Sequence, residues 1–198
     1  MLTDIIQNWY KYSVEENFVG IGSTRKVYRV SDYVVKLHIH PIGYKQSLNE
    51  LDIYNAMVEQ GLHELFAKTY YVDEYVSIQD YYKPVAMRDN QSFEIDIKRE
   101  NIYIPSKYEE AMSRLDNEFD CFDIKDSSNY GLNKENKLVF IDYGMSKKLY
   151  ENEWVELAES GILPQIHFTN CSVCGLKKEL RMYGEHDGDN RCYDCGKE

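Results

Sequence analysis

The stretch Cys121-Phe122-Asp123-Ile124-Lys125-Asp126-Ser127-Ser128-Asn129 and the later tetrapeptide Ile141-Asp142-Tyr143-Gly144 decide the fold that this sequence predicts. Between them, residues 130–132 and 138–141 are expected to form a hairpin. A loop aspartate and asparagine, a hairpin and an aspartate–aromatic–glycine triplet indicate a metal–nucleotide site. One carboxylate can orient a hydroxyl nucleophile there, while the asparagine and the second aspartate offer Mg²⁺ the oxygen ligands that it prefers.

Three upstream features extend this pattern in a fixed order along the chain. The motif Gly20-x-Gly22-x-x-Arg25-x-Val27 lies between two expected strands, where glycines would let backbone N–H groups approach phosphates. Lys36 lies inside an apolar strand over residues 33–38, and Glu50 follows on a helix. Each feature alone has an ordinary explanation: a glycine-containing hairpin, a lysine on the solvent face, or a helix-capping glutamate. The ordered set is much less expected by chance.

On these residues, the sequence resembles the protein-kinase-like superfamily, particularly the short kinase-like proteins of bacteria and their phages, over about residues 15–150. The resemblance implies an α+β, two-lobed kinase-like fold in residues 1–168. An N-lobe would span about residues 1–84, and a strongly shortened C-lobe about residues 85–168. It also implies ATP and Mg²⁺ as cofactors.

The resemblance further implies a role for each matching residue. Gly20 and Gly22 would belong to the nucleotide-covering loop, and Val27 would pack on the adenine beside a hinge at residues 79–84. Lys36 would contact the α/β-phosphates and pair with Glu50.

In the second half, the resemblance makes Asp123 the catalytic aspartate. Lys125 matches the lysine two positions later in many Ser/Thr kinases, and Asn129 and Asp142 would bind the Mg²⁺. Asn129 lies six residues after Asp123, where the usual spacing is five. That register leaves Asp126 as a rival for the catalytic position.

Other departures from the family pattern bear on activity. Arg25 stands at the third glycine of the loop, and Cys121-Phe122 replaces the usual His-Arg. Only 26 residues separate Gly144 from Cys171, so the activation segment and most large-lobe helices cannot fit. ATP binding should survive these losses better than protein phosphorylation.

Two functions therefore stay open for this part of the chain. One is an ATP/Mg²⁺-dependent phosphotransferase that moves the γ-phosphoryl group to a hydroxyl on a protein or a small molecule. The other is a catalytically inactive pseudokinase that acts as a protein-binding module. The retained charged residues favour the enzyme, and the shortened second half favours the binding module.

The C-terminal residues 169–198 carry a more specific signal, Cys171-x2-Cys174-x17-Cys192-x2-Cys195. Paired thiolates at this spacing can hold one tetrahedral, structural Zn²⁺, and the segment resembles a small β zinc ribbon. A hairpin is expected between the two cysteine pairs, with tight turns at Gly175 and Gly196. His186 is expected to be a solvated loop residue, and Cys121 a small buried hydrophobe.

The charge balance limits the class of partner. The chain has 23 basic and 34 acidic residues and a formal net charge of −11, which argues against broad binding to a nucleic-acid backbone. The cysteine segment is also slightly acidic, so a nucleic-acid-binding zinc ribbon is disfavoured. ATP and a protein substrate or protein partner are expected, and the oligomeric state stays open.

The sequence also gives expectations about location and local structure. The N-terminus lacks a basic export segment and no apolar run could span a bilayer, so we expect a cytoplasmic chain, in the host cytoplasm if it is viral.

Thr3 is expected to cap a helix that turns Ile5, Ile6, Trp9 and Tyr10 inward. Ser47 and Ser106 head capping boxes, each with glutamate three residues later. The isoleucines at 95, 97, 102 and 104 indicate one more hairpin.

Overall fold

A five-stranded antiparallel sheet dominates the first half of the chain in the computed structural model, which describes residues 1–96 and 103–198. In spatial order its strands are β1 (Phe18–Ile21), β2 (Arg25–Val30), β3 (Tyr33–His38), β5 (Val76–Asp80) and β4 (Thr69–Val72). A two-residue turn joins β2 to β3, with Ser31 in the left-handed region at φ 58°. This turn sets a register in which Val27 pairs with Lys36.

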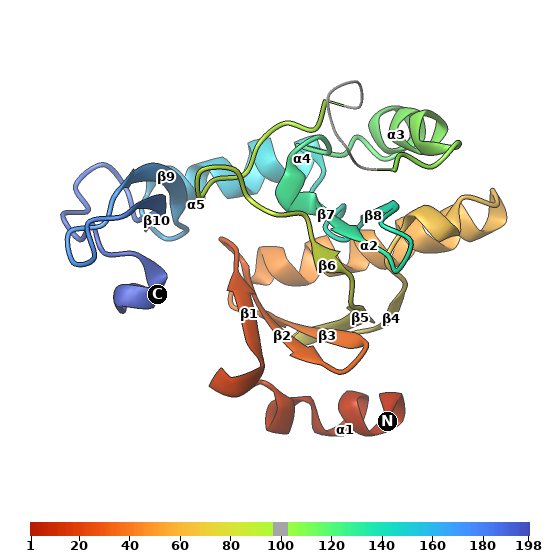
Figure 1. The fold of residues 1–198 in the computed structure, drawn as a ribbon, viewed down its shortest axis with the longest axis horizontal. Helices are drawn as coiled ribbons and strands as arrows, with labels where there is room; N and C mark the ends of the chain where they lie inside the picture. Colours follow the sequence, from red (N-terminus) through yellow and green to blue (C-terminus); the bar gives the residue numbers. More distant parts are fainter. Residues whose placement is uncertain (97–102) are drawn as a thin grey trace.

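Two helices cover the two faces of this sheet (Figure 1). Helix α1 (Leu2–Tyr12) packs Ile5 into an apolar cluster with Tyr28, Val35 and other strand residues. Helix α2 (Pro41–Glu59) lies on the other face, where Lys36 and Ser77 pair across β3 and β5. Because strand side chains alternate between faces, one face of the sheet is apolar and the other carries buried polar groups.

The helix starts differ from the expected capping. Thr3 lies within α1, which Met1 precedes without a side-chain cap, and Tyr10 is exposed. Helix α2 begins at Pro41, six residues before Ser47, because a proline suits the first turn and the His40 side chain accepts a hydrogen bond from the Ile42 N–H. Ser47 is therefore a buried interior residue of the helix.

The second half of the chain combines a small sheet with short helices. Its elements are β6 (Lys83–Pro84), α3 (Tyr108–Asn117), β7 (Tyr130–Leu132), β8 (Leu138–Phe140), α4 (Lys147–Leu149), a π-helical turn (Tyr150–Trp154) and α5 (Val155–Glu159). Lys107 precedes α3 without a side-chain cap, so the Ser106 capping box is also wrong. The hairpin expected around Ile97 and Ile102 lies outside the described residues.

Helix α2 belongs to both halves. Its residues Ile53, Tyr54 and Met57 enter the largest apolar cluster, which also contains Tyr130 and Phe140 from β7 and β8. The face that α2 turns to the five-stranded sheet is polar, whereas the rest of its buried surface is apolar. The helix therefore contacts both halves, the five-stranded sheet through polar groups and the second half through an apolar cluster.

The C-terminal tail, residues 165–198, forms a separate two-stranded hairpin (Figure 1). Strands β9 (Gln165–Asn170) and β10 (Lys177–Met182) pair antiparallel, and Cys171 and Cys174 lie in the turn between them. The hairpin thus flanks the first cysteine pair, whereas the sequence predicted it between the two pairs. The second pair follows in an irregular segment that ends in a 3₁₀ turn (Tyr193–Cys195).

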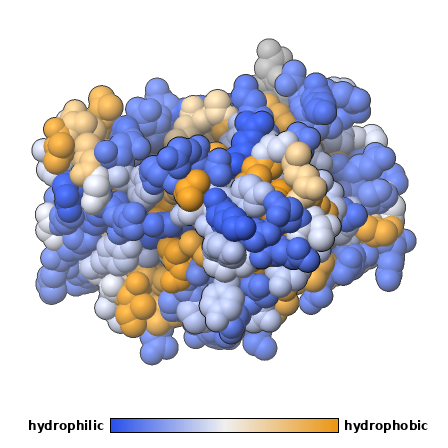
Figure 2. Space-filling view, turned by 90° about the horizontal axis from the view of Figure 1, so that it is seen from below, coloured by the Kyte–Doolittle hydropathy of each residue, from blue (hydrophilic) through white to orange (hydrophobic). Residues whose placement is uncertain are grey.

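The surface is mainly hydrophilic on the side shown in Figure 2, where hydrophobic side chains form smaller patches between polar ones. This agrees with the high content of charged residues in the sequence. Among the described residues, no helix has both the length and the apolar character that a bilayer-spanning segment needs.

Gly144 allows the segment after β8 to lie directly on α2. A Cβ at this position would stand 2.0 Å from the Gln46 carbonyl oxygen and 2.8 Å from Glu50 Cγ. We therefore predict that Gly144→Ala lowers the free energy of unfolding by about 1–3 kcal/mol or more, measured by urea denaturation.

Gly20→Ala is the matched control, because no atom of the described residues lies within 4 Å of a Cβ built there. This substitution should change the free energy of unfolding by less than about 0.5 kcal/mol. Equal effects of the two substitutions would contradict the close packing of Gly144 on α2.

Candidate functional site

The predicted site residues Lys36 and Glu50 form a buried ion pair. Lys36 Nζ lies 3.1 Å from both carboxylate oxygens of Glu50 and donates a further hydrogen bond of 2.7 Å to the Ile141 carbonyl. Lys36 is 5% exposed and Glu50 is fully buried. The lysine therefore lies on the α2 side of the sheet, not on a solvent face.

Arg25 joins this pair to Asp142. Its guanidinium donates to Glu50 Oε1 at 3.0 Å and to Asp142 Oδ1 at 2.6 Å. A second bond from Nη1 reaches Ser47 Oγ at 3.2 Å. Two cations and two carboxylates from β2, β3, α2 and the segment after β8 thus form one connected network, in the order Lys36, Glu50, Arg25, Asp142.

The role of Arg25 was not predicted, although the sequence contains a signal for it. A two-residue turn at Ser31-Asp32 pairs Val27 with Lys36 and Arg25 with His38. Arg25 must then share a sheet face with Lys36, since the side-chain period of a strand is two. Within the glycine motif, Arg25 stands out only as a residue in place of the third glycine.

Burial and charge act together on these groups. Burial, aided by the charge of Arg25, lowers the pKa of Lys36 even though Glu50 opposes the change. Burial alone would raise the pKa of Asp142, but the charges of Arg25 and Lys36 outweigh it and lower that pKa. Asp142 therefore stays ionised, and its side chain is 42% exposed.

The loop after α3 brings Asp123 and Asn129 beside Asp142. The Asn129 side-chain amide donates to the Asp123 backbone carbonyl at 2.7 Å. The backbone carbonyl of Asn129 accepts from the N–H groups of Ile141 and Asp142. Asp123 has φ 56°, a left-handed conformation that is uncommon for a non-glycine residue. Burial, followed by the charges of Asp126 and Asp142, raises the pKa of the Asp123 carboxyl to about 6.

The neighbouring residues of this loop have different surroundings. The Asp126 carboxylate accepts a hydrogen bond from the Ser128 N–H at 2.8 Å and so caps the short 3₁₀ turn Ser127–Asn129. Lys125 points to Glu94, with 3.6 Å between Nζ and Oε1, and both side chains are exposed. Lys125 therefore lies at the surface and outside the buried ion-pair network.

The glycine loop, residues 20–25, connects β1 to β2. The Gly22 N–H donates to the Arg25 carbonyl at 2.9 Å. Within the described part of the chain, a Cβ on Gly20 would have no neighbour within 4 Å, and one on Gly22 would lie 3.9 Å from the Arg25 carbonyl oxygen. Packing within the protein therefore does not require glycine at either position. Val27 follows on β2, opposite Lys36.

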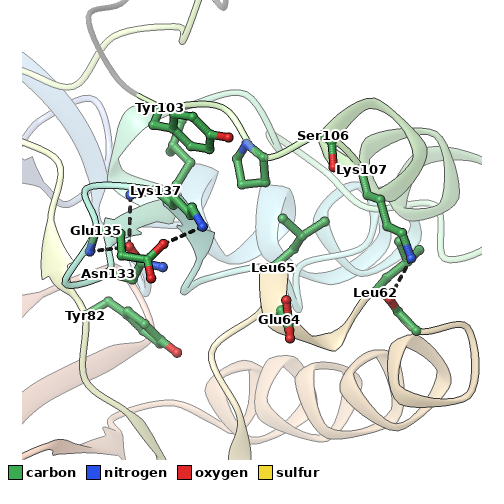
Figure 3. A pocket seen from close by; sticks show the side chains of 13 residues that line it. Leu62, Glu64, Leu65, Tyr82, Tyr103, Ser106, Lys107, Asn133, Glu135 and Lys137 are labelled. Atoms are coloured by element: carbon green, nitrogen blue, oxygen red, sulfur yellow. Dashed lines mark hydrogen bonds and ion pairs between the residues drawn. The ribbon is translucent and has the colours of Figure 1, made fainter.

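Cavities lie beside the loop after α3 and near the end of α2. A groove of ≈ 680 Å³ beside α3 is lined by Asp123, Lys125 and Asp126, together with Glu94 and Glu109. The cavity in Figure 3, of ≈ 550 Å³, lies between the end of α2 and the β7–β8 turn. None of the predicted site residues lines this second cavity. Several of its charged groups have partners: Lys137 pairs with Glu135, and Lys107 donates to the Gly61 carbonyl.

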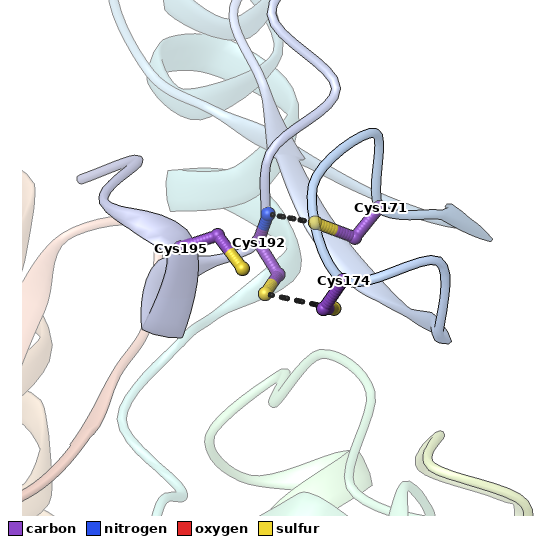
Figure 4. Close-up of side chains that lie close together, drawn as sticks. All are labelled: Cys171, Cys174, Cys192 and Cys195. Atoms are coloured by element: carbon purple, nitrogen blue, oxygen red, sulfur yellow. Dashed lines mark hydrogen bonds between the residues drawn. The ribbon is translucent and has the colours of Figure 1, made fainter.

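The four tail cysteines converge on one point (Figure 4). Their sulfur atoms all lie within 4.8 Å of one another, and Cys174 Sγ is 4.0 Å from Cys192 Sγ. All are free thiols. Four sulfurs around a tetrahedral Zn²⁺ at about 2.3 Å would be about 3.8 Å apart, so the cluster could hold a zinc ion.

Backbone N–H groups favour the thiolate form of one member of this cluster, Cys171. The pKa of Cys171 is lowered to about 6, chiefly by the Cys174 N–H and further by the N–H groups of Cys192 and Val173. Gly175 and Gly196 adopt φ values of 71° and 95°, which allow the tight turns after each cysteine pair as predicted. His186 is exposed and lies outside the cluster.

No protein-family model matches this chain, and a search of curated proteins finds no significant relative. The function must therefore be inferred from the geometry of the two sites.

Glu50 is the carboxylate shared by both buried cations, so its removal should be costly. We predict that Glu50→Gln lowers the free energy of unfolding by about 3–5 kcal/mol, because Lys36 is then buried without a carboxylate. Chemical denaturation measures the change. As a control, Glu153→Gln breaks the exposed pair with Lys45 and should cost at most about 1 kcal/mol. A Glu50→Gln effect no larger than the control would contradict the network.

Proposed function

We propose that residues 1–168 form an ATP- and Mg²⁺-dependent phosphotransferase of the protein-kinase-like type. The observation that carries this proposal is the meeting of Lys36, Glu50 and Asp142 in one ion-pair network, with Asn129 bonded to the same backbone segment. These residues come from distant parts of the sequence and share a position only after folding. An N-lobe of residues 1–84 and a C-lobe of residues 85–168 would flank the nucleotide.

The residues around the network suit a nucleotide and its metal. The open backbone of Gly20 and Gly22 would cover the phosphates, Val27 would contact the adenine, and Lys36 would reach the α/β-phosphates. Asn129 and Asp142 supply the oxygen donors that Mg²⁺ prefers, and Asp142 is partly exposed. When bound, Mg²⁺ would neutralise charge on the phosphates.

Asp123 is the group proposed to act on the phosphate acceptor. Its carboxylate would accept the proton of an acceptor hydroxyl while the new oxygen–phosphorus bond forms and the bond to ADP breaks. The raised pKa, about 6, suits a base that works near neutral pH. Asp126 is the weaker candidate because its carboxylate already caps the next turn.

The phosphate acceptor would enter from the groove beside α3, where Asp123 and Lys125 form part of the lining. The hydroxyl could belong to a protein or to a small molecule. Lys125 is exposed, and among the described residues its ion-pair partner is the exposed Glu94, so it would contact the acceptor or the transferred phosphoryl group.

A binding-only pseudokinase is the second candidate function. It is favoured by Arg25, whose guanidinium lies 2.6 Å from the Asp142 oxygen and so competes with a metal for that carboxylate. The short second half also leaves little surface for a peptide substrate. In this case the nucleotide fold and the tail would serve to bind another protein.

For the tail, we propose a structural zinc ribbon held by Cys171, Cys174, Cys192 and Cys195. The support is the cysteine geometry together with the small apolar core. That core consists of Leu180, Met182, Cys171 and Cys192, with Cys195 packed against them. A segment with so little apolar burial needs the metal for its stability, since structural zinc sites contribute on the order of 10–16 kcal/mol.

The phosphotransferase proposal predicts both nucleotide binding and transfer. ATP with Mg²⁺ at 100 times its Kd should stabilise the protein by roughly 2.7 kcal/mol, and Lys36→Met should weaken this effect. Asp123→Asn should abolish γ-phosphoryl transfer yet leave the ATP affinity nearly unchanged. Thermal shift and radiolabelled transfer assays measure the two properties.

Transfer by the wild type should fall as the pH drops through about 6, because protonated Asp123 cannot accept the hydroxyl proton.

Asp126→Asn is the matched control and should retain transfer. If this variant loses transfer and Asp123→Asn does not, the roles of the two aspartates are reversed. Nucleotide binding without transfer to proteins or small hydroxyl compounds would favour the pseudokinase. No stabilisation at millimolar ATP would reject both nucleotide proposals.

The zinc proposal predicts one zinc per chain by elemental analysis. Cys174→Ser should lower this content, and zinc affinity should fall with decreasing pH because protonated thiols do not bind the metal. Cys121→Ser is the control, since this buried cysteine lies outside the cluster and should leave the zinc content unchanged. Absence of zinc from protein purified without chelators would contradict the proposal.

A further inference from the structure

The tail contacts the glycine loop and both strands that carry it. The Arg181 guanidinium on β10 donates to the Gly22 carbonyl. The Tyr193 ring stacks on Phe18 of β1, with centroids 4.6 Å apart and planes at 18°. Lys26 of β2 pairs with Glu198 at 2.9 Å. The tip and both sides of one hairpin are therefore held by one small segment.

Arg181 is the most informative of these contacts. Its side chain is only 6% exposed, and no carboxylate of the described residues forms an ion pair with it. Besides Gly22, the guanidinium bonds Tyr183 Oη at 3.1 Å, and that hydroxyl donates to the Glu198 carbonyl. A buried cation without a counter-charge is costly, so its position is not explained by pairing within the tail.

A second contact with the same loop comes from the second half of the chain, before the tail. The Trp154 indole N–H, on the π-helical turn, donates to Ser23 Oγ at 3.0 Å. Gly22 and Ser23 are thus fixed by two donors from different segments. A loop with open glycines would otherwise be among the less constrained parts of the sheet.

We propose that the cysteine tail is a metal-dependent clamp on the glycine loop, with Arg181 as its positioning residue. The tail core is built around Cys171 and Cys192, so the position of Arg181 depends on the state of the cysteine cluster. Metal loading then controls the order of the loop and, through it, nucleotide affinity. This last step rests on the nucleotide role proposed for the loop.

The clamp is tested by hydrogen exchange of residues 18–25 in the full chain, without nucleotide or Mg²⁺. Arg181→Ala should speed exchange about tenfold while zinc stays bound, because a hydrogen bond from a charged donor is lost. Arg181→Lys should partly restore protection. Chelation of the zinc should speed exchange at least as much. Lys177→Ala, which removes a charge that contacts Phe168 within the tail, should behave as the wild type.

Phe18→Leu provides a second test from the body side if Arg181→Ala fails to fold, and it should also speed exchange at the loop. If the exchange rate of residues 18–25 in Arg181→Ala equals that of the wild type, the clamp is overturned. If Arg181→Ala does not fold, the same result in Phe18→Leu overturns it. The ATP Kd should rise about tenfold in Arg181→Ala. Faster exchange with an unchanged Kd supports the clamp and overturns the nucleotide role of the loop, so the two failures are distinguishable.

Discussion

The fully buried carboxylate of Glu50 is the constraint on which the other parts of the structure depend. It forms ion pairs with Lys36 of β3 and Arg25 of β2, and Arg25 also forms an ion pair with Asp142. A buried carboxylate is tolerated only with close counter-charges, so the strands and α2 can occupy few other relative positions. The arrangement that satisfies Glu50 also places the candidate nucleotide and metal ligands together.

The same network links the two halves of the chain. Arg25 and Asp142 are 117 positions apart, so their contact forms only when both halves have folded and docked. Gly144 strengthens this dependence, because its missing side chain lets the following backbone touch α2. A local change in α2 should therefore alter the conformation of the loop around Asp123, although no side chain of α2 lines the groove beside α3. Such coupling suits a site assembled from both halves.

Sequence reasoning was most accurate where a local rule fixes geometry. The apolar stretch over residues 33–38 forms the expected strand, β3, and the cysteine spacing predicted the cluster. It failed where several rules competed, as at α2, where Pro41 and His40 start the helix before the Ser47 capping box. Arg25 was missed because a comparison with a motif considers residue type, whereas its role comes from sheet face and burial. The tail hairpin was predicted at the wrong position, because the spacing of the cysteines does not determine whether the strands flank one cysteine pair or lie between the two pairs.

The hydrogen bond between Trp154 and the glycine loop has a spectroscopic consequence. The chain contains two tryptophans, and the other, Trp9, lies on α1 beside Tyr75, on the far face of the sheet. Indole emission responds to the polarity and hydrogen bonding of its surroundings. Trp154 is therefore a natural optical reporter of the loop through Ser23, and Trp9 is a reference in the same molecule. Rearrangements at the mouth of the site can be followed by intrinsic fluorescence in unlabelled protein.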